Sequence, residues 1–102
     1  MIAINVLEPW VAVTGDRERQ ALELQLQQEA PPDHVLAGTH PHAVARRQDR
    51  DDVLFALGSE RWAVVHLTWQ GSQTDANWPR TTILEGRGQL QALIERDAAD
   101  FA

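Results

Sequence analysis

His66 is the residue whose type and position are best suited to chemistry in this chain. It lies among apolar residues in the β-prone run 61–69, and a carboxylate from the adjoining turn, Asp51 or Asp52, could hold it as a general base. A histidine in such a run is more often structural, because buried polar groups are normally hydrogen-bonded to a neighbour. No nucleophile stands at a recognisable spacing from His66, so the sequence predicts no catalytic residue and no enzyme.

Two groups of potential metal ligands are better explained without a metal ion. His40 and His42, with His34 nearby, match no known ligand spacing, and Pro41 restricts the backbone between the pair. In segment 46–52 three aspartates alternate with three arginines, which predicts mutual ion pairs, and the glycine and final glutamate of an EF-hand loop are missing. The sequence therefore predicts a solvated histidine loop, no metal site and no cofactor.

Tryptophans are candidates for a binding surface, because this residue type is enriched at the centres of protein interfaces. The usual place of a tryptophan is the core, and we expect Trp69 there. Trp78 lies in a polar loop before Pro79. It either caps the edge of the core or belongs to a recognition surface, and the sequence leaves both interpretations open.

Composition narrows the classes of function. A length of 102 residues predicts a single domain over residues 1–102. The net charge of -6 argues against non-specific nucleic-acid binding and suits a basic partner. Without cysteine or lysine, the chain lacks disulfides, zinc–thiolate sites, thiol nucleophiles and Schiff-base chemistry. It has neither an apolar run near the roughly 20 residues that span a bilayer nor a signal-peptide pattern, so we expect a cytoplasmic protein without membrane contact.

The run 61–69 is expected to form the central strand, which must position these side chains. Because side chains alternate along a strand, one face is wholly apolar and must lie against a core. That face carries Ala63, Val65, Leu67 and Trp69. The other face, which is mixed and expected to be half covered, carries Trp62, Val64, His66 and Thr68.

Further β-prone runs are expected to pair around this strand. Strands are predicted at 42–48, 53–57 and 81–85, with Val53, Phe55 and Leu57 sharing the apolar face of the central strand. Residues 2–6 and 10–13 could form a small hairpin. Surface loops are predicted at 33–41 and 70–80.

Two helices complete the predicted architecture. Strong helix formers fill 17–29, with Asp16 as N-cap and with Leu22 and Leu26 facing inward. From Gln89 onward an apolar stripe recurs at helical spacing, formed by Leu90, Leu93, Ile94, Ala98 and Phe101. The predicted fold class is α+β, an antiparallel β-meander of three or more strands packed against N- and C-terminal helices. We expect the last helix on the face of Val65 and Leu67.

Five short segments carry a family resemblance over roughly residues 33–82. They are Asp33–Gly38, Ala43–Arg47, Asp51–Phe55, Val64–Trp69 and Trp78–Pro79. In this order and spacing they resemble a group of short uncharacterised bacterial proteins with an Ala-Arg-Arg, Asp-Asp-Val-Leu-Phe, Val-His-Leu-Thr-Trp and Trp-Pro core, which in turn resemble toxin-immunity proteins. The resemblance implies that His34, Asp52, His66, Trp69 and Trp78 belong to one constellation. Where relatives tend to have Gly-His-Pro-Leu, this chain has Asp33–Leu36.

These observations favour a cytosolic protein-binding domain, and the resemblance implies an immunity protein that neutralises a basic bacterial toxin. The candidate binding residues are His34, Asp51, Asp52, His66, Trp69 and Trp78. One alternative is a small-ligand-binding protein or enzyme that uses His66, Asp52 and Trp78 in a pocket. Another is a homodimer that forms through exposed tryptophans.

Overall fold

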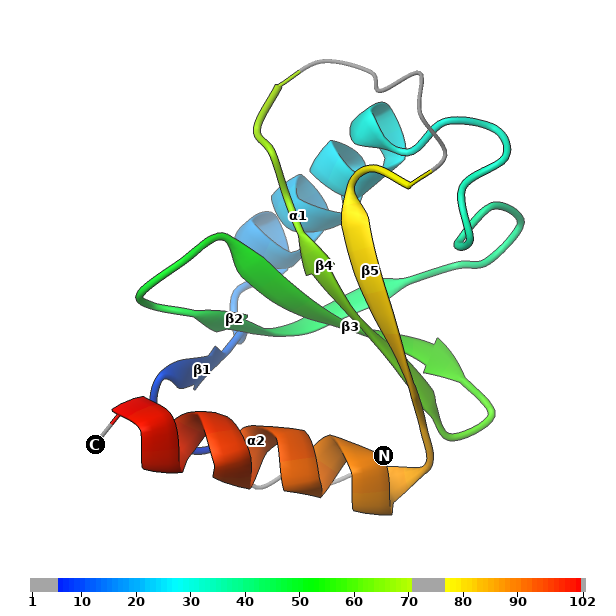
Figure 1. Ribbon diagram of the computed structural model, residues 1–102. Coiled ribbons are helices and arrows are strands. Elements are labelled where there is room, and N and C mark those ends of the chain that lie inside the picture. The colour runs from blue at the N-terminus through cyan, green and yellow to red at the C-terminus, as the bar shows by residue number, and fades with distance from the viewer. Residues whose placement is uncertain (1–5, 71–76, 102) are drawn as a thin grey trace.

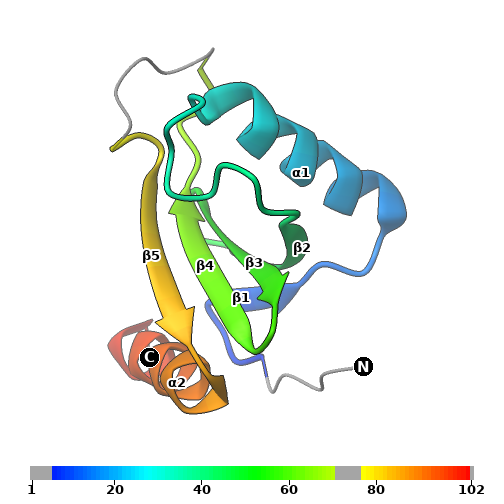
Figure 2. The same ribbon diagram turned by 90° about the vertical axis from the view of Figure 1, so that its right-hand side faces the viewer.

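The computed structural model describes residues 6–70 and 77–101 (Figure 1). These residues form five strands and two helices, in the order β1 (Trp10–Ala12), α1 (Asp16–Glu29), β2 (His42–Arg47), β3 (Asp52–Gly58), β4 (Arg61–His66), β5 (Arg80–Glu85) and α2 (Arg87–Phe101). The strands make one antiparallel sheet whose spatial order follows the chain. The two helices lie on opposite faces of this sheet (Figure 2). The α+β meander with N- and C-terminal helices is therefore confirmed.

The first face of the sheet is covered by α1. Leu22 and Leu26 point inward from this helix, as predicted, and pack with the apolar side chains of β3 and β4. The predicted register holds, because Val53 pairs with Val65 and Phe55 with Ala63. The expectation that the C-terminal helix covers Val65 and Leu67 is wrong, since α1 fills that place. Strand alternation decides which residues share a face, but it does not specify which helix covers them.

The second face is covered in part by α2. Leu90 and Ile94 pack on a cluster that includes Trp10, Leu54 and Trp62. Trp62, expected on a half-covered face, is fully buried. The apolar stripe of the helix is inward only over its first turns, because Ala98 is half-buried and Phe101 is exposed.

The N-terminal segment pairs differently from the prediction. Of the expected hairpin, the first strand falls largely on residues outside the described ones, and Trp10–Ala12 pairs with β2. Gly15 is the N-cap of α1, and Asp16 is its first residue. Most of the predicted loop 70–80 also lies outside the described residues. Within residues 6–70 and 77–101, no helix combines the length and apolarity needed to cross a membrane.

Cover of the second face decreases along β4 and β5 from one end to the other (Figure 2). Beneath α2, the cross-strand pair Trp62 and Leu84 is buried. In the next pair, Val64 is half-buried and Thr82 exposed. In the last pair, His66 and Arg80 are both exposed. One end of this face is therefore closed by α2 and the other is open.

Candidate functional site

Three charged or titratable side chains lie in a row across the open end of the second face. Asp52 of β3 is the cross-strand partner of His66 of β4, and His66 is the partner of Arg80 of β5. Directly opposed residues in an antiparallel sheet lie on the same face with closely spaced side chains. The register of three strands thus assembles Asp52, His66 and Arg80, which we call the open row.

A hydrogen bond of 2.8 Å joins His66 Nδ1 to Asp52 Oδ1. An ionised carboxylate only accepts, so Nδ1–H is the donor and Nε2 is the ring nitrogen left for a ligand. The side chain of His66 is about half exposed, whereas that of Asp52 is largely buried. The pairing of His66 with a carboxylate of the turn is found, but the burial expected for a structural histidine is not.

Two arginines and a tryptophan surround the open row. The guanidinium of Arg80 lies 5.5 Å from the centroid of the Trp78 ring, a cation–π distance. Arg50 Nη1 is 3.9 Å from Asp52 Oδ2. These groups border an open cavity of about 380 Å³, lined by Arg50, Asp52, Val64, His66, Trp78, Arg80 and Thr82.

The two arginines of this cavity were missed by sequence reasoning. Arg80 was assigned to a loop, and Arg50 was interpreted only as a counter-charge for the aspartates. Extending the last strand by one residue would have placed Arg80 on the face of Thr82 and Leu84. Alternation within β5 was therefore the pattern that could have found Arg80.

Trp69, predicted in the core, is instead 48% exposed. Strand β4 ends at His66, and Trp69 has φ +57, a left-handed conformation that costs a tryptophan roughly 1–3 kcal/mol. The reason lies in α1, where the fully buried carboxylate of Glu29 accepts the backbone N–H of Trp69 at 2.9 Å. The same carboxylate accepts the backbone N–H and the hydroxyl of Thr68, both at 2.8 Å.

His34 is buried and does not line the cavity. Its Nδ1 accepts the backbone N–H of Leu36 at 3.1 Å. Nε2 therefore carries the proton and donates to the carbonyl of Pro79 at 2.9 Å. The prediction of a solvated loop is therefore wrong for His34. Its hydrogen bonds connect the segment beside Trp78 to the loop after α1.

The six sequence-predicted residues thus divide into three groups. Asp52, His66 and Trp78 line one cavity. Asp51 and Trp69 are exposed outside the cavity lining, and the carbonyl of Asp51 accepts the backbone N–H of Leu67 at 3.0 Å. His34 is buried. The single constellation implied by the resemblance is brought together only in part.

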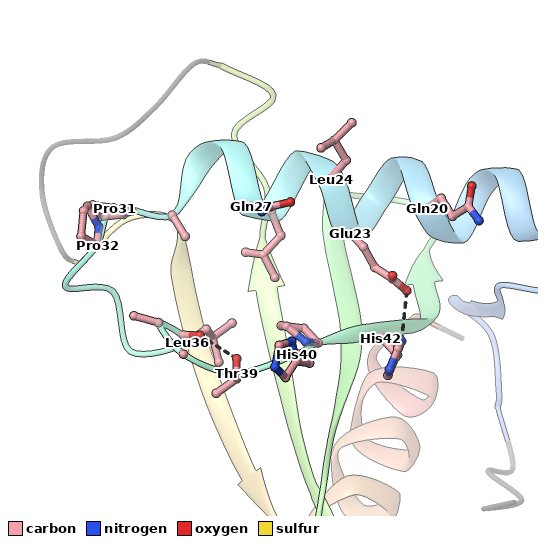
Figure 3. Close-up of a pocket in the computed structure, with 15 residues that line it drawn as sticks. Gln20, Glu23, Leu24, Gln27, Pro31, Pro32, Leu36, Thr39, His40 and His42 are labelled. Carbon is pink, nitrogen blue, oxygen red and sulfur yellow. Dashed lines mark hydrogen bonds and ion pairs between the residues drawn. The ribbon is translucent and has the colours of Figure 1, made fainter.

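A larger cavity of about 650 Å³ lies between α1 and the loop that leads into β2 (Figure 3). His40 and His42 line it, and His42 Nδ1 is 3.7 Å from Glu23 Oε2. Glu23 also accepts the backbone N–H of Ala43 at 3.0 Å, while Leu24 points away from the loop. The carboxylate of Glu23 is therefore already engaged, and none of the six predicted residues lines this larger cavity. For these reasons we favour the smaller cavity as the site.

The alternating charges of segment 46–52 form ion pairs, as predicted, but not all with one another. Arg47 binds Asp49 through two hydrogen bonds of 2.8 Å, and the bond from Arg47 lowers the pKa of Asp49 below its ordinary value. The hydrogen bond to Asp49 likewise raises the pKa of Arg47. Arg46 pairs with Glu18 of α1 at 3.1 Å instead.

Metal chemistry finds no support among the described parts of the chain, where no group of three or more His, Cys, Asp or Glu side chains could hold an ion. Among the described residues that line the smaller cavity, Thr82 is the one with a side-chain hydroxyl group. The arrangement offers an oriented imidazole and two guanidinium groups.

No family model, no curated protein and no solved structure matches this chain. The functional assignment of the chain therefore rests on the geometry of the open end alone.

Proposed function

We propose that this chain is a small protein-binding domain, acting as an immunity protein that docks on a basic toxin domain. The docking surface is the tryptophan end, which we define as Trp69, Trp78, Asp33 and Asp51. The observation that carries the proposal is the outward placement of Trp69, 48% exposed and held at φ +57 by a buried carboxylate.

The local energetics of Trp69 support a binding role. A chain reversal at φ +57 is easiest for glycine, and asparagine or aspartate tolerate it better than tryptophan does. This chain has the bulkiest residue there and stabilises it with Glu29, a carboxylate whose burial is itself unfavourable without hydrogen bonds. Strained residues that are held in place by their surroundings concentrate at functional sites, and tryptophan dominates binding hot spots.

The charges around the two tryptophans support a basic partner. Asp33 and Asp51 are exposed, and within the described residues neither carboxylate has an ion-pair partner. Both lie near the tryptophans, because His34 bonds the carbonyl of Pro79 and Leu67 bonds that of Asp51. Unpaired carboxylates around an aromatic centre would steer a positively charged surface toward it.

The test uses the protein encoded next to this chain's gene, produced together with this chain. We expect Trp69→Ala to weaken the complex about 30-fold in calorimetric titration, the loss typical of a hot-spot tryptophan. Phe101→Ala is the matched control, because Phe101 is an aromatic residue 45% exposed on α2, away from the sheet's open end. Equal affinities for the two variants would contradict the proposal.

A second candidate function is the binding of a small ligand in the smaller cavity. The convergence of Asp52, His66 and Trp78 around one space favours it. We propose no catalytic step for His66, since the candidate needs only an oriented imidazole. The homodimer alternative stays a prediction, and sedimentation across a dilution series would test it.

A further inference from the structure

We infer that the cavity beside the open row binds an oxyanion, the carboxylate or phosphate of a small molecule, between Arg80 and His66. This inference rests on the second candidate function and names its ligand class. It does not require the tryptophan end to bind a protein.

The cavity is locally basic in an acidic chain. The whole chain has a net charge of -6, yet two arginines, one histidine and a single carboxylate line this space. That carboxylate is already shared, because Asp52 bonds His66 through Oδ1 and lies 3.9 Å from Arg50 through Oδ2. Among the described residues, Arg80 has no carboxylate within ion-pair distance.

The two ends of the β4–β5 pair show that this lack is local. At the far end of the strand pair, on the first face of the sheet, Arg61 stands opposite Glu85, and the two side chains meet at 3.0 Å. At the open end, Arg80 stands opposite His66, whose carboxylate partner is on the other side in β3. Opposite charges across neighbouring strands are favourable, so an anion beside Arg80 would supply the partner that the opposite strand does not.

The position of Arg80 suits such a ligand. Its guanidinium carbon lies over the Trp78 ring, 5.5 Å from the centroid, and the attraction between the cation and the ring favours this position of the side chain. A guanidinium binds carboxylate and phosphate with two parallel N–H donors, and a side chain that is already held in place loses less entropy when it does so.

The remaining lining suits a small ligand. Thr82 adds a hydroxyl, whereas Val64 and Trp78 provide apolar surface for the ligand's carbon atoms. A volume of about 380 Å³ falls near the lower limit of small-molecule sites, which run from roughly 300 to 1,000 Å³. The ligand class is therefore a compact molecule with one oxyanion group in contact with Arg80.

The test titrates the full chain with inorganic phosphate and, separately, with succinate at constant ionic strength, followed by backbone and indole NMR signals. We expect saturable shifts at Arg80, His66 and Trp78 with a dissociation constant on the order of 1 mM for the better ion. Comparison of the two ions decides whether phosphate or carboxylate is preferred. Absence of saturation by either ion below about 50 mM would overturn the inference.

Matched charge variants locate the site. Arg80→Gln should weaken binding about tenfold, and Arg80→Lys should weaken it less, because the charge remains but the fork is lost. Arg61→Gln makes the same change in net charge at the far end of the strand pair, on the first face of the sheet, and should leave the affinity unchanged. Equal loss in Arg61→Gln and Arg80→Gln would overturn the inference. Trp69→Ala should leave anion binding intact, so a failure of the protein-binding proposal is distinguishable from a failure of this one.

Discussion

The part of the second sheet face that α2 covers and the open end differ in how their charged groups are satisfied. Under α2, Asp97 accepts the Trp10 indole N–H at 2.8 Å and lies 3.5 Å from Arg47. At the open end, the sheet continues without helical cover, and His66 and Arg80 remain exposed. Buried hydrogen bonds and ion pairs of this kind favour stability, whereas exposed donors beside exposed tryptophans favour binding. The comparison assigns a structural role to the part under α2 and recognition to the open end.

The largest effect is expected in the part of the second face under α2, from Asp97→Ala. This change leaves the buried indole N–H of Trp10 without its acceptor and removes one counter-charge from the buried guanidinium of Arg47. We expect a loss of about 3 kcal/mol in the free energy of unfolding, measured by urea denaturation. The control Asp100→Ala changes an exposed carboxylate of the same helix and should stay within about 0.5 kcal/mol. Similar losses in both variants would show that Asp97 has no special structural role.

A smaller loss is expected from Glu29→Gln, which alters the support of Trp69. In wild type one oxygen of Glu29 accepts Trp69 N–H and Gln25, while the other accepts both donors of Thr68. Either orientation of a glutamine amide places its NH₂ against donors, so we expect a loss of about 2 kcal/mol together with weaker partner binding. Glu18→Gln, in a surface ion pair, is the control for stability. An unchanged partner affinity in Glu29→Gln would separate Trp69 from recognition.

Low pH should reduce the stability of the folded protein through protonation of Asp49. Its pKa is lowered in the folded protein chiefly by the hydrogen bond from Arg47, so the unfolded chain binds this proton more readily. The stabilisation is therefore complete above the ordinary aspartate pKa of about 3.9 and is lost as pH falls through the lower folded value. Asp49→Asn should show a shallower decline of stability between about pH 4 and pH 2 than wild type. Parallel declines in the two proteins would contradict this role.

The smallest expected effect concerns association with a basic partner. Replacing Asp33 and Asp51 by asparagine should slow association about threefold at low salt, measured by stopped-flow fluorescence. The difference should disappear in high salt, because the ions screen exposed charges. Asp100→Asn removes a carboxylate at the end of α2 and provides the control. An unchanged association rate at low salt would remove the steering argument.

Local periodicity was sufficient to predict the meander and the face shared by Val53 and Val65, because strand alternation depends only on neighbouring residues. It could not predict which helix covers that face, since α1 and α2 both carry apolar stripes of similar kind. Contacts between distant segments decide the choice. The pairing of Asp97 with Trp10, 87 residues apart, fixes α2 on the second face.

The errors at the candidate site have the same origin. Trp69 was expected in the core because its position continues the alternation of β4, yet the strand ends at His66. Glu29, 40 residues away, redirects the backbone there. Arg80 was missed because the last strand was predicted to begin one residue too late, at Thr81. A residue outside a predicted strand is assigned to neither face of the sheet. A carboxylate partner for His66 could be predicted as Asp51 or Asp52, because one short turn joins the two strands, and the structure shows that it is Asp52.

The four tryptophans allow the central claim to be measured directly. Trp10 and Trp62 are buried in the cluster under α2, whereas Trp69 and Trp78 are exposed at the open end. In an NMR titration of the labelled chain with the protein encoded beside its gene, the indole N–H signals of Trp69 and Trp78 should shift or broaden, while those of Trp10 and Trp62 keep their positions. Shifts confined to the Trp10 and Trp62 signals, with Trp69 and Trp78 unchanged, would contradict the assignment of recognition to the open end.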